Sequence, residues 1–410
     1  MFQTLFSQKF ALERHRTGPL AVERQRYLQH CADQGATRGQ QCKRAKCILW
    51  IAKRMSGVDH HGVDATRLQA IVYRRPSPGA AMAQVLLEFG RPWLKFLGWW
   101  REEPEPIPFP EQLERYVTWM RCERGLSPET IYGRSRRVAN FLRWCGQTGR
   151  DFATLCPEDL DAYFAAFSDQ WSRISAATEA TRLRVFLRHA ASTGACCHGL
   201  SDSILSPRTY KLESLPYALS WEDVRRLIAS AGSASARDVR DRAILMLLAI
   251  YGLRRGEVAS LRLDQIDWAR HCLWIQRLKC RQPQVYPLQR SVAKSLSRYI
   301  DTVRPPVPCR PPVPCPEVFI RLQAPLKPIS AGAIYHIVSE RLRARGIKAA
   351  HLGPHALRHS CAAKLLANDL TLKEIGDHLG HRSTAATMIY TKVDLVALHE
   401  VGAFDLGDLP

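Results

Sequence analysis

The longest apolar run of the chain is AILMLLAIYGL, from Ala243 to Leu253. It has about half of the roughly 20 apolar residues that a helix needs to cross a membrane. In a chain with 24% charged residues, such a run predicts a helix buried at the centre of a folded domain. The N-terminal residues MFQTLFSQKFALERHR lack a sustained apolar stretch. We therefore expect no signal peptide, no membrane partner and a cytoplasmic location.

The charge of the chain limits its partners. Its 410 residues contain 59 Lys and Arg against 38 Asp and Glu, which gives a net charge of +21. A surplus of this size predicts a polyanionic partner, and nucleic acid is the usual one. A basic but inert surface, or a genome that favours Arg codons, is the alternative. Codon bias explains the many arginines but not the shortage of acidic residues.

The cysteines indicate a reducing compartment. There are 13 of them, an odd number spread along the chain without a CxxC pair, which is typical of free thiols. The groups Cys196-Cys197-His198 and Cys309 with Cys315 lack the spacing of a structural zinc site. We expect no metal and no cofactor.

Prolines divide the chain. Pro104, Pro106, Pro108 and Pro110 predict a linker, because proline blocks helix continuation and restrains the residue before it. A second irregular connector, ILSPRTYKLESLP, lies near residues 204–216. The sequence therefore predicts three domains: a basic helical extension over 1–103, a helical domain over 107–203 and a last domain over 215–410.

The two upstream domains contain mixed basic and apolar helices. Residues 40–55 alternate cationic and apolar side chains at helical spacing, and Ser127 with Pro128 predicts the start of another such helix. Four helices are expected between 111 and 194. Their arginines face either solvent or DNA. The candidate DNA-binding residues are Lys43, Arg44, Lys46, Arg134, Arg136 and Arg137.

The last domain alternates helices with two short strand signals, at 271–276 and 284–288. The fold class that we expect is therefore mainly α with a small β-sheet in the last domain (α+β). A tandem repeat, RPPVPCRPPVPC, spans 304–315. Its prolines favour an extended surface loop without a chemical role.

Four strings in the last domain contain residues suited to phosphate chemistry: GLRRGE, LKCRQPQVYPL, GPHALRHS and LGHRSTAATMIY. His355 and Arg358 are three residues apart and share a helix face; His359 could support them. Taken singly, the other candidates have ordinary explanations. Arg254 could be a surface residue beside a helix end, Lys279 a solvated loop lysine and Tyr390 a core aromatic.

Together and in this order, the strings resemble those of the tyrosine recombinase, or phage integrase, family over residues 109–395. The resemblance implies a helical, SAM-like core-binding domain followed by an integrase-like catalytic domain. Cys280, where glycine is common, and Gln282, where a basic residue is common, depart from the family pattern. The implied catalytic residues are Arg254, Lys279, His355, Arg358, His381 and Tyr390.

The resemblance also implies a function. Tyr390 would cleave DNA through a covalent 3′-phosphotyrosine, without ATP or metal, while Arg254 and Arg358 stabilise the charge on the phosphate. Double-stranded DNA and a homo-oligomer, a tetramer in the synaptic complex, are the implied partners, and a bacterial mobile element, DNA integration and transposition fit the chemistry. Two alternatives remain open: topoisomerase-like relaxation of DNA, and a DNA-binding protein that has lost catalysis.

Overall fold

The computed structural model describes residues 1–56, 62–74, 77–102, 107–208, 218–277, 283–306, 315–347, 351–380 and 387. These residues form two compact units. One consists of Met1–Trp100 together with Ser214–Pro410, and the other of Arg101–Glu213. The sequence predicted three domains, and their independence stays a prediction. Within the described ranges, every helix is too short or too polar to cross a lipid bilayer.

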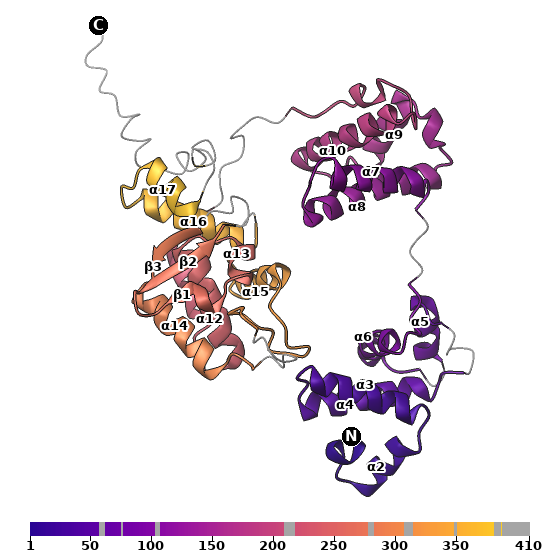
Figure 1. Ribbon diagram of the computed structural model, residues 1–410, viewed down its shortest axis with the longest axis vertical. Coiled ribbons are helices and arrows are strands. Elements are labelled where there is room, and N and C mark those ends of the chain that lie inside the picture. Colours follow the sequence, from indigo (N-terminus) through magenta and orange to yellow (C-terminus); the bar gives the residue numbers. More distant parts are fainter. Residues whose placement is uncertain are drawn as a thin grey trace. The chain divides into compact units, whose positions relative to one another are not determined.

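The N-terminal residues form helices around an apolar core (Figure 1). Thr37 caps α4 with a reciprocal bond to Gln40. Ala324 packs into this core, and the backbone N of Leu326 donates to Gln34 O at 3.1 Å. The helices are α1 (Phe2–Leu5), α2 (Lys9–Arg16), α3 (Ala21–Asp33), α4 (Arg38–Ala52), α5 (Ala65–Tyr73) and α6 (Ala80–Phe96).

A buried arginine closes the turn between α2 and α3. Arg24 Nη2 donates to the carbonyls of His15 and Gly18, at 2.8 and 2.9 Å, and its Nε donates to Pro19 O at 2.8 Å. The His15 ring stacks on Phe6 with 4.2 Å between centroids. Burial, and then the charge of Arg24, lowers the pKa of His15 to about 4.

The second unit contains the four expected helices: α7 (Pro110–Cys122), α8 (Pro128–Gln147), α9 (Pro157–Ala166) and α10 (Arg173–Ser192). Ser127 Oγ accepts a bond from Thr130 N at 3.4 Å, which confirms the predicted start of α8. Aromatic rings fill the core: Phe186 meets Tyr116 edge-on at 5.2 Å, and Phe141 meets Tyr163 at 5.0 Å. Such pairs stabilise a small helical unit beyond the area that they bury.

Most of the predicted apolar run, up to Ile250, lies in α12 (Ala236–Ile250), which is buried at the centre of the last part of the chain. α12 contacts α11 (Trp221–Ala229), α14 (Arg290–Thr302), α15 (Ala331–Ala344) and α16 (Pro354–Leu366). The short helix α13 (Arg255–Ala259) follows it, and α17 (Leu372–Leu379) is the last described helix.

A small antiparallel sheet confirms the expected α+β fold. Its order is β1 (Ile266–Asp267), β2 (Cys272–Gln276) and β3 (Pro283–Pro287), with Leu273 opposite Tyr286. Leu273, Ile275 and Tyr286 are buried in the core, whereas Trp274 and Val285 are exposed. Alternate residues of a strand point to opposite faces, so only one face of the sheet packs on the helices.

The end of α17 lies against the end of β2. Gly380 terminates α17 with φ +66°, and Arg277 Nη2 donates to His378 O at 2.9 Å. A Cβ atom added to Gly380 would lie 2.5 Å from Arg277 Nε. Glycine is required here both for the left-handed backbone and for the close approach.

The low pKa of His15 predicts a loss of stability in mild acid. As the pH falls from about 6.5 towards 4, the unfolded chain binds a proton that folded His15 does not, so the free energy of unfolding falls over that window. His15→Gln should reduce this pH dependence, measured as the denaturation midpoint or the amide exchange of α2 and α3. His198→Gln, at an exposed site, is the control. Equal pH dependence in wild type and His15→Gln would contradict the prediction.

Two glycines with similar φ allow a matched test of the contact between α17 and β2. Gly346 has φ +63° and no atom within 4 Å of an added Cβ, so Gly346→Ala should cost only the roughly 1–2 kcal/mol of left-handed strain. Gly380→Ala should cost clearly more, because the methyl group also meets Arg277. Chemical denaturation measures the free energy of unfolding of both variants. Equal decreases would show that the Arg277 side chain moves aside without destabilising the protein.

Candidate active site

Arg254 lies where the chain leaves α12. Its backbone N donates to Glu257 Oε2 at 2.8 Å, and its Nη1 donates to Glu257 Oε1 at 2.9 Å. Its Nη2 reaches Gly380 O at 3.3 Å. The side chain is 28% exposed, so the guanidinium is fixed by the fold and still reaches solvent.

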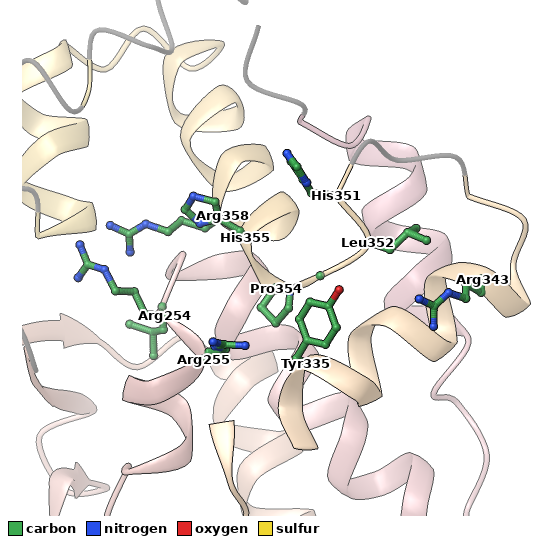
Figure 2. Close-up of a pocket in the computed structure, with 11 residues that line it drawn as sticks. Arg254, Arg255, Tyr335, Arg343, His351, Leu352, Pro354, His355 and Arg358 are labelled. Carbon is green, nitrogen blue, oxygen red and sulfur yellow. The ribbon is translucent and has the colours of Figure 1, made fainter. Parts of the chain in front are cut away.

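Arg358 lies one turn inside α16, which starts at Pro354. Its Nη1 donates to Gly252 O at 2.6 Å and its Nη2 to Leu379 O at 2.7 Å. The two arginines therefore bind consecutive carbonyls at the end of α17. Their guanidinium groups point to the same side of the pocket (Figure 2).

His355 lies in the first turn of α16, one turn before Arg358, as the spacing predicted. Its ring packs against that of His359, with centroids 4.4 Å apart and planes at 63°. His359 is thus a direct neighbour of His355, which agrees with the supporting position expected for it.

A hollow of about 720 Å³ opens beside these three residues. Among the described residues, its lining contains arginines and histidines and no acidic residue, so the hollow favours an anion. Figure 2 shows Tyr335 and Arg255 on the side away from Arg358. The lining residues are Leu253, Arg254, Arg255, Tyr335, Arg343, His351, Leu352, Gly353, Pro354, His355 and Arg358.

Two residues behind Arg254, Glu257 and Arg277, were not predicted from the sequence. Both are almost completely buried, and Arg277 Nη1 donates to Glu257 Oε2 at 2.8 Å. Glu257 could have been identified from its place three residues after Arg254, as the acidic partner of a helix start. For Arg277, which precedes the strand hairpin turn, no local pattern gives a signal.

Burial also affects the neutral groups behind the pocket. The pKa of the Tyr286 phenol is raised mainly by burial, and the pKa of His378 is lowered by burial and by the charge of Arg277. The rings of these two residues meet edge-on at 5.2 Å. Tyr286 and His378 are therefore neutral, and the charges of the site come from its arginines and from Glu257.

Three of the six expected catalytic residues, Lys279, His381 and Tyr390, lie outside the described residues. The structure thus brings together Arg254, His355 and Arg358. The middle of the proline repeat, residues 307–314, also lies outside the described part of the chain.

The candidate DNA-binding residues differ in exposure. The exposed candidates are Lys43, Lys46, Arg136 and Arg137. Arg44 is half-buried, with its guanidinium 5.8 Å from the Phe89 ring, so packing accounts for part of its role. Arg134 lines a second hollow between α8 and α10 with Thr130, Thr178, Thr181 and Arg182. Arg137 lies 4.0 Å from the buried Glu179 carboxylate.

The sequence is similar to those of known recombinases. Residues 218–395 match the phage integrase family. The integrase/recombinase y4rF of Sinorhizobium fredii is 31% identical over 98% of this chain and 95% of its own length. The tyrosine recombinase XerD of Listeria monocytogenes is 29% identical over 70% of this chain and 96% of its own.

Solved structures share the fold. A lambda integrase fragment in a dimer bound to a COC′ core site covers 69% of this chain and 94% of its own, with a TM-score of 0.53 and 16% identity. XerH recombinase bound to difH covers 88% of this chain and 96% of its own, with a TM-score of 0.52 and 17% identity. These likenesses support the mainly helical architecture. The similarity to y4rF along almost the whole sequence, with the family match over residues 218–395, shows that this chain belongs to the phage integrase family, as a tyrosine-type recombinase that breaks and rejoins DNA.

Proposed function

We propose that this recombinase cleaves DNA at a specific site through a covalent 3′-phosphotyrosine, and that Tyr390 is the nucleophile. Arg254, Arg358, His355, His381 and Lys279 would complete the catalytic set. The observation that supports this most strongly is the convergence of Arg254 and Arg358 on the carbonyls of Leu379 and Gly380. His381 follows directly in the sequence.

The held arginines suit the transition state of phosphoryl transfer. Attack on a phosphodiester adds negative charge to its non-bridging oxygens, and a guanidinium can donate two parallel N–H bonds to them. Because Arg254 and Arg358 are already fixed by Glu257, Gly252 and Leu379, little reorganisation is needed when the charge develops. The pocket beside them, whose described lining residues include no acid, would accept the phosphate.

The proposed reaction needs no cofactor, because each bond that forms is matched by one that breaks. The Tyr390 phenol loses its proton to His355 and forms a P–O bond, while the bond from phosphorus to the 5′ oxygen breaks. Lys279 gives a proton to that oxygen and leaves a 5′-hydroxyl. The phosphotyrosine ester keeps the energy of the broken bond, so a 5′-hydroxyl of another strand can reverse the step and release the tyrosine.

Double-stranded DNA is the proposed partner, and strand exchange requires several protomers. Lambda integrase has been solved as a tetramer bound to a Holliday junction, and we propose a tetramer for this chain in its synaptic complex. The net charge of +21 favours binding along the DNA backbone. Lys43, Lys46, Arg134 and Arg136 are proposed contacts to phosphates. A bacterial nucleoid location and a role in a mobile element fit this activity.

Relaxation of supercoiled DNA by the same chemistry is the second candidate. It would need no pairing of two sites, and a recombination assay with two sites distinguishes it. A DNA-binding protein without catalysis is disfavoured, because Arg254, His355 and Arg358 line one pocket.

A nicked suicide substrate tests the nucleophile. Wild type should become covalently attached to DNA recovered from its host, and Tyr390→Phe should bind this DNA without attachment. Arg254→Ala should slow attachment by about 10²–10³-fold, the usual effect of losing one transition-state donor, with a much smaller change in DNA affinity, since many phosphate contacts share the binding.

Gel electrophoresis of the adduct measures attachment, and a filter or gel-shift assay measures affinity. Arg136→Ala is the matched control, since it should weaken binding without changing the attachment rate at saturating DNA. An adduct formed by Tyr390→Phe would exclude Tyr390 as the nucleophile.

A further inference from the structure

We infer that Arg277 is a positioning residue for the DNA cleavage proposed above, on which this inference rests. By sharing the buried carboxylate of Glu257, Arg277 keeps the positive charge of Arg254 available to the phosphate. Arg277 does not line the pocket and would act only through Glu257 and Arg254.

The two guanidinium groups bind one carboxylate at different oxygens. Arg254 Nη1 donates to Oε1 at 2.9 Å, and Arg277 Nη1 donates to Oε2 at 2.8 Å. The backbone N of Arg254 also donates to Oε2 at 2.8 Å. The side chain of Glu257 is 0% exposed and that of Arg277 is 2% exposed, so water screens these charges only weakly.

The count of charges explains the consequence. With Arg277 present, the cluster of Arg254, Arg277 and Glu257 carries a net charge of +1, in addition to the charge of Arg358. Without Arg277, Glu257 would neutralise Arg254, and this pair would add no net charge to that of Arg358 at the phosphate. Oε2 of the buried Glu257 would also lose its charged partner, and the unpaired negative charge would draw the Arg254 guanidinium towards Glu257 and away from the pocket.

Arg277 is itself fixed from several directions. Its Nε donates to Gln284 Oε1 at 2.7 Å, its Nη2 donates to His378 O at 2.9 Å and to the Tyr286 hydroxyl, and Gly380 leaves room for the guanidinium. Arg277 therefore joins the β2–β3 hairpin to the end of α17, where the carbonyls of Leu379 and Gly380 hold the two active-site arginines.

A lysine could not replace this side chain fully. An ammonium group is a single point charge, whereas the guanidinium fork donates in several fixed directions at once. Arg277→Lys should keep the charge balance with Glu257 and lose part of the junction with Gln284, Tyr286 and His378. We expect its cleavage rate to lie between those of wild type and a variant without the charge.

A double-mutant cycle separates charge sharing from packing. Arg277→Met should slow covalent attachment to the suicide substrate at least about tenfold, with DNA affinity within about threefold of wild type, because a buried charge pair is broken beneath a transition-state donor. Arg277→Met with Glu257→Gln should be faster than Arg277→Met alone, since the second change removes the uncompensated carboxylate. A role in packing alone gives no such recovery.

Arg341→Met provides the matched control. Arg341 is another largely buried arginine, with a side chain 11% exposed, and it is bound to Asp238 and Asp241 at 2.6 and 2.7 Å. It does not line the pocket. This variant should lose stability comparably but attach to DNA at the wild-type rate. Rates are taken at a temperature at which circular dichroism shows every variant folded, and Arg277→Lys replaces Arg277→Met if the latter does not fold.

The outcomes are distinct. The inference is supported if the double variant attaches to DNA faster than Arg277→Met and Arg341→Met attaches at the wild-type rate. Where Arg277→Lys is used instead, an attachment rate between those of wild type and Arg254→Ala supports it. Attachment by Arg277→Met at the wild-type rate, a double variant no faster than Arg277→Met, or Arg277→Lys as slow as Arg254→Ala where it stands in, overturns it while the proposed function stands. If wild type forms no adduct on DNA recovered from its host, the proposed function fails first, and the inference falls with it.

Discussion

A carboxylate buried away from water must be paired, and Glu257 meets this requirement by binding Arg254 and Arg277 together. Glu257 lies in α13, Arg254 directly precedes this helix, and Arg277 directly follows β2. Because the cost of leaving the carboxylate unpaired is large, the hairpin and the start of α13 are held in one relative position. The orientation of Arg254 towards the pocket depends on this constraint.

The backbone carbonyls at the end of α17 also hold the arginines of the site. Carbonyls at a helix C-terminus have no partner within the helix and attract positive charge. Here they accept bonds from Arg254, Arg277 and Arg358. Three cations that would otherwise repel one another are thus stabilised within one small region, and this makes a preorganised anion site possible.

Both the pairing of Glu257 and the contacts at the end of α17 depend on the buried helix α12. Its apolar side chains contact α11, α14, α15 and α16, so the chain leaves it at a fixed point. Gly252 turns there with φ +59°, its carbonyl accepts a bond from Arg358, and Arg254 follows two residues later. The hydrophobic core therefore determines where the charged residues emerge.

The sequence by itself determined the helical character of the chain, the two paired strands and the spacing that puts His355 and Arg358 on one face of α16, because periodicity and helix caps are local properties. It also indicated Arg254, because the string GLRRGE around it resembles that of the tyrosine recombinase family. Only the tertiary structure decided that Gly252, Leu379 and Gly380 hold the arginines and that Arg277 shares the carboxylate of Glu257. These contacts join residues 20 to 126 positions apart, and a local pattern contains no information about which distant carbonyl a buried guanidinium will meet.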